Sequence, residues 1–85
     1  MDKNKKLIKI QSEIIIYLKK KGNLPKTDLL SFRYIDHGVI DSLNLFKFII
    51  FLEKKFKIKI TTKNSESDEF RYIGGLIKLI SKKIK

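Results

Sequence analysis

Apolar residues recur at helical spacing in three parts of the chain, and this pattern predicts three main α-helices. The first helix is expected over residues 3–21, the second starts after Asp41, and the third covers residues 72–83. Gly74 and Gly75 are each expected to weaken the third helix by about 1 kcal/mol relative to alanine. Because each apolar face must be buried against a neighbour, we expect a small all-α bundle.

The first predicted helix ends at clear stop signals. Its last turn, Lys19 to Lys21, suits the negative C-terminal end of the helix dipole. Gly22 is expected to adopt the left-handed conformation that often follows a helix, and Pro25 prevents continuation. The residues expected on its buried face are Leu7, Ile10, Ile14, Tyr17 and Leu18, widened by Ile8 and Ile15.

The second predicted helix carries two apolar stripes, and Asp41 is a good N-cap for it. One stripe predicts a face toward the core, and the other lies beside it. Such a helix is either central to the core or keeps one stripe for a partner. The core stripe consists of Leu45, Phe48, Ile49, Leu52 and Phe56, and the second stripe of Leu43, Phe46 and Ile50.

The connections are expected to pack on the core. Residues 22–40 are too apolar for a free linker, so we expect one short helical turn there and a turn at Gly38. Residues 55–62 alternate like a strand, but no second strand is available to pair with them. We expect an extended loop there, followed by one short helix within residues 62–70. The side chains expected to point inward from the loop are Phe56, Ile58 and Ile60.

The composition fits a single domain and excludes several kinds of site. The chain has 85 residues, 42% of them hydrophobic, which predicts one domain over residues 1–85. It has no cysteine and a single histidine, His37, so disulfides and cysteine or histidine metal clusters are excluded. The longest apolar run covers residues 48–52, and the N-terminus lacks a signal-peptide core. We therefore expect a cytoplasmic protein without stable membrane insertion.

The positive charge is concentrated at the two ends of the sequence. Of the formal net charge of +11, residues 1–27 carry +6, residues 28–53 carry −2 and residues 54–85 carry +7. Basic chains often bind nucleic acid or an anionic surface. One alternative is therefore a small basic helical nucleic-acid-binding protein, and another is a membrane-surface or partner-helix adaptor that uses the first helix. We expect no nucleic-acid partner, because the lysines gather at helix ends and no known motif is present.

The candidate site is Ser42, at the start of the second helix. The free amides and positive dipole end of a helix favour a phosphate attached at this position. A triad of Ser42, His37 and Asp41 is not expected, because neighbours in sequence do not easily form a nucleophile, base and orienter. We expect no role for His37 and no enzymatic activity. The Asp41-Ser42 pair alone is also typical of an ordinary helix start.

The residues around Ser42 resemble the carrier-protein family, which comprises acyl carrier proteins and peptidyl, aminoacyl and D-alanyl carriers. The family pattern has an acidic residue and a glycine before Asp-Ser-Leu, then a helix that ends in Leu-Glu and an aromatic residue. An Ile-x-Ile step and a final helix introduced by Phe-x-x-Ile follow. The matching residues are Asp36, Gly38, Asp41-Ser42-Leu43, Leu52-Glu53, Phe56, Ile58-Lys59-Ile60, Phe70, Ile73, Leu76 and Leu79-Ile80.

The resemblance implies a small acyl-carrier-like bundle of three main helices plus one short helix. Ser42 would carry 4′-phosphopantetheine, transferred from coenzyme A by a phosphopantetheinyl transferase, and would hold an acyl or aminoacyl group as a thioester. Asp41 would cap the helix and help the transferase to place its metal, whereas the chain itself would have no metal site. The residues implied in partner docking are Leu43, Phe46, Lys47, Ile50, Glu53 and Lys54.

Two departures from the family pattern narrow this expectation. Gly38 and Ser42 are one residue further apart than in fatty-acid-synthesis carriers. This longer spacing resembles that of stand-alone D-alanyl or aminoacyl carriers. The resemblance implies two partners, an acyl- or aminoacyl-adenylating ligase and a downstream transferase, in lipid or secondary-metabolite biosynthesis. It also implies that the carrier itself is a monomer. Fatty-acid carriers present acidic docking helices, whereas Lys47, Lys54 and Lys55 lie on or near this one. We therefore expect a partner with a less basic or acidic docking surface.

Overall fold

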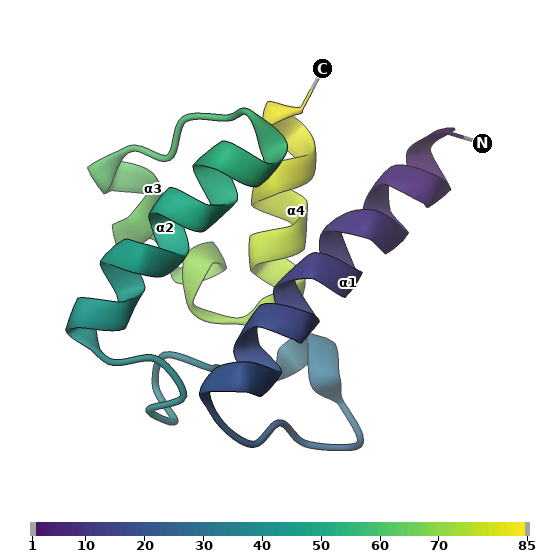
Figure 1. The fold of residues 1–85 in the computed structure, drawn as a ribbon. Helices are drawn as coiled ribbons and strands as arrows, with labels where there is room; N and C mark the ends of the chain where they lie inside the picture. Colours follow the sequence, from purple (N-terminus) through teal and green to yellow (C-terminus); the bar gives the residue numbers. More distant parts are fainter. Residues whose placement is uncertain (1, 85) are drawn as a thin grey trace.

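The structure is a bundle of three long helices with short helical turns in the connections (Figure 1). The computed structural model describes residues 2–84. The helices are α1 (Asp2–Lys21), α2 (Ser42–Phe56), α3 (Thr62–Glu66) and α4 (Ile73–Lys83), with two 3₁₀ helices, η1 (Leu29–Ser31) and η2 (Asp68–Arg71). No strand is present among residues 2–84. The prediction of a small all-α fold with three main helices is confirmed.

Both α2 and α4 run antiparallel to α1 (Figure 1). Between α1 and α2, Glu13 forms an ion pair with Lys55 at 3.4 Å. One turn further along α1, the ring of Tyr17 stacks on that of Phe51 with centroids 4.7 Å apart. The contacts therefore advance along α1 while they move backwards along α2.

The core contains residues from all three long helices and from the connections. On α1, Ile10, Ile14 and Leu18 are buried as predicted. The prediction is wrong for Leu7 and Ile8, which are both exposed. Leu7 lies in the first turns of α1, which diverge from α4 (Figure 1), whereas Ile8 is two residues from Ile10 and therefore points away from the buried face. The buried core residues are Ile10, Ile14, Leu18, Tyr34, Ile40, Phe48, Leu52, Ile60, Phe70, Ile73, Leu76, Ile77 and Ile80.

The connection over residues 22–40 packs on the core and contains η1, as predicted. Gly38 has a φ of +74°, which confirms the predicted turn. Gly22 was expected to be left-handed, and this prediction is wrong. Among the described glycines, Gly38 has the positive φ and Gly22 does not. Gly22 instead lies against Val39, whose Cγ1 would be 3.4 Å from an added Cβ.

The segment after α2 is extended, as predicted. Lys57 ends α2 in the left-handed conformation with a φ of 54°, and its N–H donates to the carbonyl of Glu53. Ile60 is buried, while Phe56 and Ile58 are partly buried against the core. Residues 62–70 form two short helical segments, α3 and η2, where one was expected.

Two glycines allow the connections to approach α4 closely. A Cβ added at Gly74 would lie 2.9 Å from the carbonyl oxygen of Leu30 in η1. One added at Gly75 would overlap the backbone of Glu69 in η2, with its Cα only 2.9 Å away. The predicted weakening applies to an isolated helix. In the packed protein, the absence of a side chain at these two positions leaves room for η1 and η2 beside α4.

Candidate functional site

Ser42 is the first residue of α2, and it is exposed. Asp41 is the N-cap, as predicted, because its carboxylate accepts a hydrogen bond from the N–H of Asn44 at 2.8 Å. The Asp41 carbonyl accepts the first helical hydrogen bond, from the N–H of Leu45 at 2.8 Å. The remaining amides of the first turn have no acceptor within the helix, so the Ser42 hydroxyl lies at a partly positive helix end.

A compact turn precedes this serine and fixes its position. The N–H of Gly38 donates to the carbonyl of Ile35 at 3.1 Å, and the N–H of Val39 donates to the carbonyl of Tyr34 at 3.0 Å. Ile40 is buried in the core immediately before the N-cap. The backbone that leads into Asp41 and Ser42 is therefore held from both sides.

Two hydrogen bonds tie this turn to η2 and to the start of α4. The fully buried hydroxyl of Tyr34 donates to the carbonyl of Phe70. The N–H of Ile73 donates to the carbonyl of Phe32 at 3.1 Å. Burial raises the pKa of Tyr34, so its hydroxyl stays protonated and remains a donor. The position of the turn is thus coupled to the final helix.

An ionic network at the surface reinforces the same junction. Asp36 pairs with Arg71 and Arg33, and Arg33 also reaches Asp68 at 2.5 Å. Hydrogen bonds from Arg71 and then Arg33 lower the pKa of Asp36 to about 2. The acidic residue that forms part of the family resemblance is therefore engaged within the chain.

The sequence reasoning did not find this junction, although a signal was present. The tetrapeptide Phe-Arg-Tyr-Ile occurs twice, at residues 32–35 and 70–73, and contains the only two arginines of a lysine-rich chain. The two copies lie against each other, with Arg33 over the ring of Tyr72 at 5.8 Å. An arginine fork can bind a carboxylate through two hydrogen bonds, which lysine cannot reproduce.

The second apolar stripe of α2 faces solvent. Leu43 is 68% exposed, Phe46 69% and Ile50 50%. Lys47 and Lys54 lie beside the stripe and are exposed as well. The core stripe of the helix buries Phe48 and Leu52, so the structure separates the two stripes that the periodicity predicted side by side. We use the name α2 outer face for Leu43, Phe46, Lys47, Ile50 and Lys54.

Glu53, the remaining residue expected in partner docking, is engaged within the chain. Its carboxylate accepts a hydrogen bond from the N–H of Ile60 at 2.8 Å, and the side chain is half-buried. Its backbone carbonyl also accepts from the N–H of Ile58 at 3.2 Å. Glu53 thus holds the extended segment after α2.

His37 is engaged by its own loop. Its ring packs on that of Phe32 with centroids 4.8 Å apart, and Nδ1 lies 3.0 Å from the carbonyl oxygen of Arg33. Among the described residues, no cluster of three or more His, Asp or Glu side chains could hold a metal ion.

Comparisons of the chain with protein-family models, with curated proteins and with solved structures found no match. Along residues 2–84, none of the helices combines the length and the apolar character needed to cross a bilayer.

Proposed function

We propose that the protein is a carrier that holds an acyl or aminoacyl group as a thioester on a 4′-phosphopantetheine arm attached to Ser42. The observation that carries this proposal is the exposed Ser42 hydroxyl at the first position of α2, beside an exposed apolar face of the same helix. The ordered resemblance from Asp36 to Ile80 supports it. An exposed hydroxyl is what a covalent arm requires, and an exposed apolar face is what a docking enzyme requires.

The residues at the helix start fit a phosphodiester. The Ser42 oxygen forms the new bond to phosphorus, loses its proton, and the nucleotide portion of coenzyme A leaves. The amides of the first turn then face the attached phosphate, which is a favourable position for an anion. Asp41 keeps the first turn formed through its bond to Asn44, and its exposed carboxylate lies next to the reacting hydroxyl. The arm supplies the thiol that carries the cargo.

The α2 outer face is the proposed docking surface for the enzymes that load and use the arm. Its apolar residues Leu43, Phe46 and Ile50 supply the contact area, and Lys47 and Lys54 supply charge. Because its charged residues Lys47 and Lys54 are basic, the face favours partners whose docking surfaces are acidic. The adenylating ligase and the downstream transferase are the proposed partners.

The decisive experiment is enzymatic attachment of the arm followed by intact-mass measurement. The protein is incubated with coenzyme A, magnesium and a broad-specificity phosphopantetheinyl transferase. We expect the mass of one phosphopantetheine to be added to the wild type and nothing to be added to Ser42→Ala. Thr62→Ala is the matched control, because Thr62 is an exposed hydroxyl residue at the start of α3. An unmodified wild type, or a modified Ser42→Ala, contradicts the proposal.

A second pair of variants separates the two proposed roles of Asp41. Asparagine is as good an N-cap as aspartate, so Asp41→Asn should retain the stability of α2 but lose the negative charge. Asp41→Ala should lose both. If the carboxylate helps the transferase to place its metal, both variants are modified slowly. Modification of Asp41→Asn at the wild-type rate would restrict Asp41 to capping.

A further inference from the structure

A second exposed surface lies on α1, away from Ser42. Its side chains recur at helical spacing and combine lysines with isoleucines. Ile8 is 64% exposed and Ile16 52%, so both apolar side chains are open to solvent. The residues of this surface, which we name the α1 outer face, are Lys5, Ile8, Lys9, Ser12, Ile16, Lys19 and Lys20.

The α1 outer face contains no carboxylate. The acid nearest to it in sequence, Glu13, lies on the flank of α1 and pairs with Lys55 of α2 at 3.4 Å. On the same flank, Tyr17 packs against Phe48 and Phe51. The flank thus belongs to the α1–α2 contact. Among residues 5–84, whose side chains the structure describes, no acid of α1 shares the α1 outer face with its four lysines.

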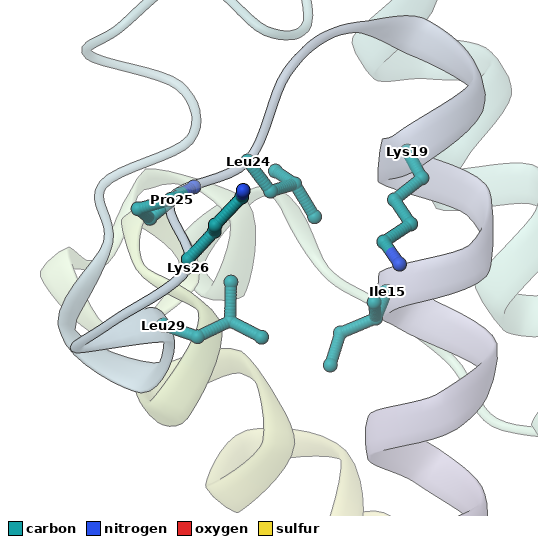
Figure 2. Close-up of a pocket in the computed structure, with 6 residues that line it drawn as sticks. All are labelled: Ile15, Lys19, Leu24, Pro25, Lys26 and Leu29. Atoms are coloured by element: carbon teal, nitrogen blue, oxygen red, sulfur yellow. The ribbon is translucent and has the colours of Figure 1, made fainter.

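A groove adjoins the C-terminal end of the α1 outer face (Figure 2). It has a volume of about 390 Å³ and lies between α1 and the connection over residues 24–29. Figure 2 shows Ile15, Leu24 and Leu29 pointing toward one another across it. Lys19 and Lys26 line opposite sides of the same groove, one from α1 and one from the connection. An apolar floor between two ammonium groups suits an anionic headgroup joined to a hydrocarbon chain.

We propose that the α1 outer face and the adjoining groove bind the surface of an anionic lipid bilayer. The lysines are attracted to the negative surface potential, and the two isoleucines enter the boundary between headgroups and acyl chains. A nucleic-acid backbone would attract the lysines but offers no apolar phase for Ile8 and Ile16. A bilayer buries both isoleucines together, without needing a recess shaped for each of them. The surface is separate from Ser42, so it leaves the α2 outer face open to enzymes.

Vesicle binding tests the electrostatic part of the proposal. The full chain is sedimented with vesicles of phosphatidylcholine alone or with an equimolar mixture of phosphatidylcholine and phosphatidylglycerol. We expect binding only to the anionic vesicles, weakened by salt. The double variant Lys9→Glu/Lys19→Glu should bind at least about twentyfold more weakly, because each lysine contributes roughly fivefold. The control Lys54→Glu/Lys63→Glu has the same net charge, and equal losses in both double variants would overturn the proposal.

Tryptophan fluorescence tests which face enters the bilayer. The chain has no tryptophan, so a single introduced residue reports only on its own position. With anionic vesicles, Ile16→Trp should shift its emission to shorter wavelength and be quenched by brominated lipid, whereas Phe46→Trp should do neither. A shift at Phe46→Trp alone would assign lipid binding to the α2 outer face. Binding without a shift at either position would show that no apolar side chain enters, and both results overturn the proposal.

Removal of the two exposed isoleucines separates lipid binding from nucleic-acid binding. We expect the exposed-site variant Ile8→Ser/Ile16→Ser to lose affinity for anionic vesicles while it keeps any affinity for duplex DNA. Circular dichroism of this variant should match the wild type, because both isoleucines are exposed. Unchanged vesicle affinity would contradict the proposal and would indicate a general polyanion surface.

Discussion

The helices α2 and α4 are both rich in apolar residues, but they occupy different places in the molecule. Of the 15 residues of α2, only Phe48 and Leu52 are buried. Of the 11 residues of α4, six are buried: Ile73, Gly75, Leu76, Ile77, Leu79 and Ile80. α2 therefore keeps an exposed apolar face, whereas the shorter helix α4 is central to the core.

The difference comes from what covers each helix. η1 approaches α4 at Gly74, η2 approaches it at Gly75, and α1 packs against it. α2 is covered on one side only, through contacts such as that between Tyr17 and Phe48. An apolar stripe without a covering element costs solubility and is typical of a site that meets partners. Apolar residues of the same type therefore form the core in α4 and an exposed face suited to partners in α2.

The largest expected effect separates the two faces of α2. Phe48→Ala should lower the free energy of unfolding by about 3–5 kcal/mol, because it leaves a cavity in the core. Phe46→Ala removes the same ring from an exposed position and should change stability by less than about 0.5 kcal/mol. Urea denaturation followed by circular dichroism measures both values. Similar losses for the two variants would show that the faces are assigned incorrectly.

A smaller change in stability tests the close approach of η2 to α4 at Gly75. Helix propensity alone predicts that Gly75→Ala stabilises the protein by about 1 kcal/mol. The overlap of the new Cβ with Glu69 instead predicts a loss of about 1–3 kcal/mol, because η2 must shift. Lys78→Ala, at an exposed position of the same helix, is the near-neutral control in the denaturation experiment. A gain in stability for Gly75→Ala would contradict the packing described.

The end of α2 offers an expected gain in stability. Lys57 adopts a left-handed conformation that suits glycine, so Lys57→Gly should stabilise the protein by about 0.5–1 kcal/mol. Lys59→Gly, in the extended segment, should be neutral or destabilising, because glycine there only increases the entropy of the unfolded chain. Thermal unfolding of the two variants compares them directly. A loss for Lys57→Gly would mean that the lysine side chain contributes more than the backbone strain costs.

The smallest effect concerns the ionic junction between the turn before α2 and the residues before α4. The pKa of Asp36 is lowered from 3.8 to about 2, so its pairing stabilises the fold fully above pH 4. This contribution is lost as the pH falls through about 2, because the folded state then binds the proton as well. Asp36→Asn should therefore flatten the dependence of unfolding on pH between 4 and 2. Identical slopes for wild type and variant, measured by urea denaturation across that range, would contradict the assigned pairing.

Several features of the fold followed from the sequence alone. Helical spacing predicted α1, α2 and α4 to within one residue of their observed starts, and Asp41 was recognised as the N-cap of α2. The separation of Phe48 from Phe46 also followed, because residues two apart on a helix point in different directions. These are local consequences of periodicity and capping, and they need no knowledge of tertiary contacts.

Other features depended on contacts between distant parts of the chain. Periodicity did not reveal that Glu53 bonds to Ile60, that Tyr34 reaches Phe70, or that η2 needs the space at Gly75. It also misplaced Leu7, because a stripe of apolar residues does not specify how far along a helix its neighbour extends, and Ile8, which lies on the side of α1 away from the core.

The sequence by itself determined the helices, the N-cap of α2 and the position of Ser42 at the start of α2. The tertiary structure decided which apolar stripes became core and which stayed exposed, because burial depends on the covering elements and not on the stripe. It also decided which charged residues are engaged within the chain, as Asp36 is, and which remain free at the surface, as the lysines of the α1 outer face do.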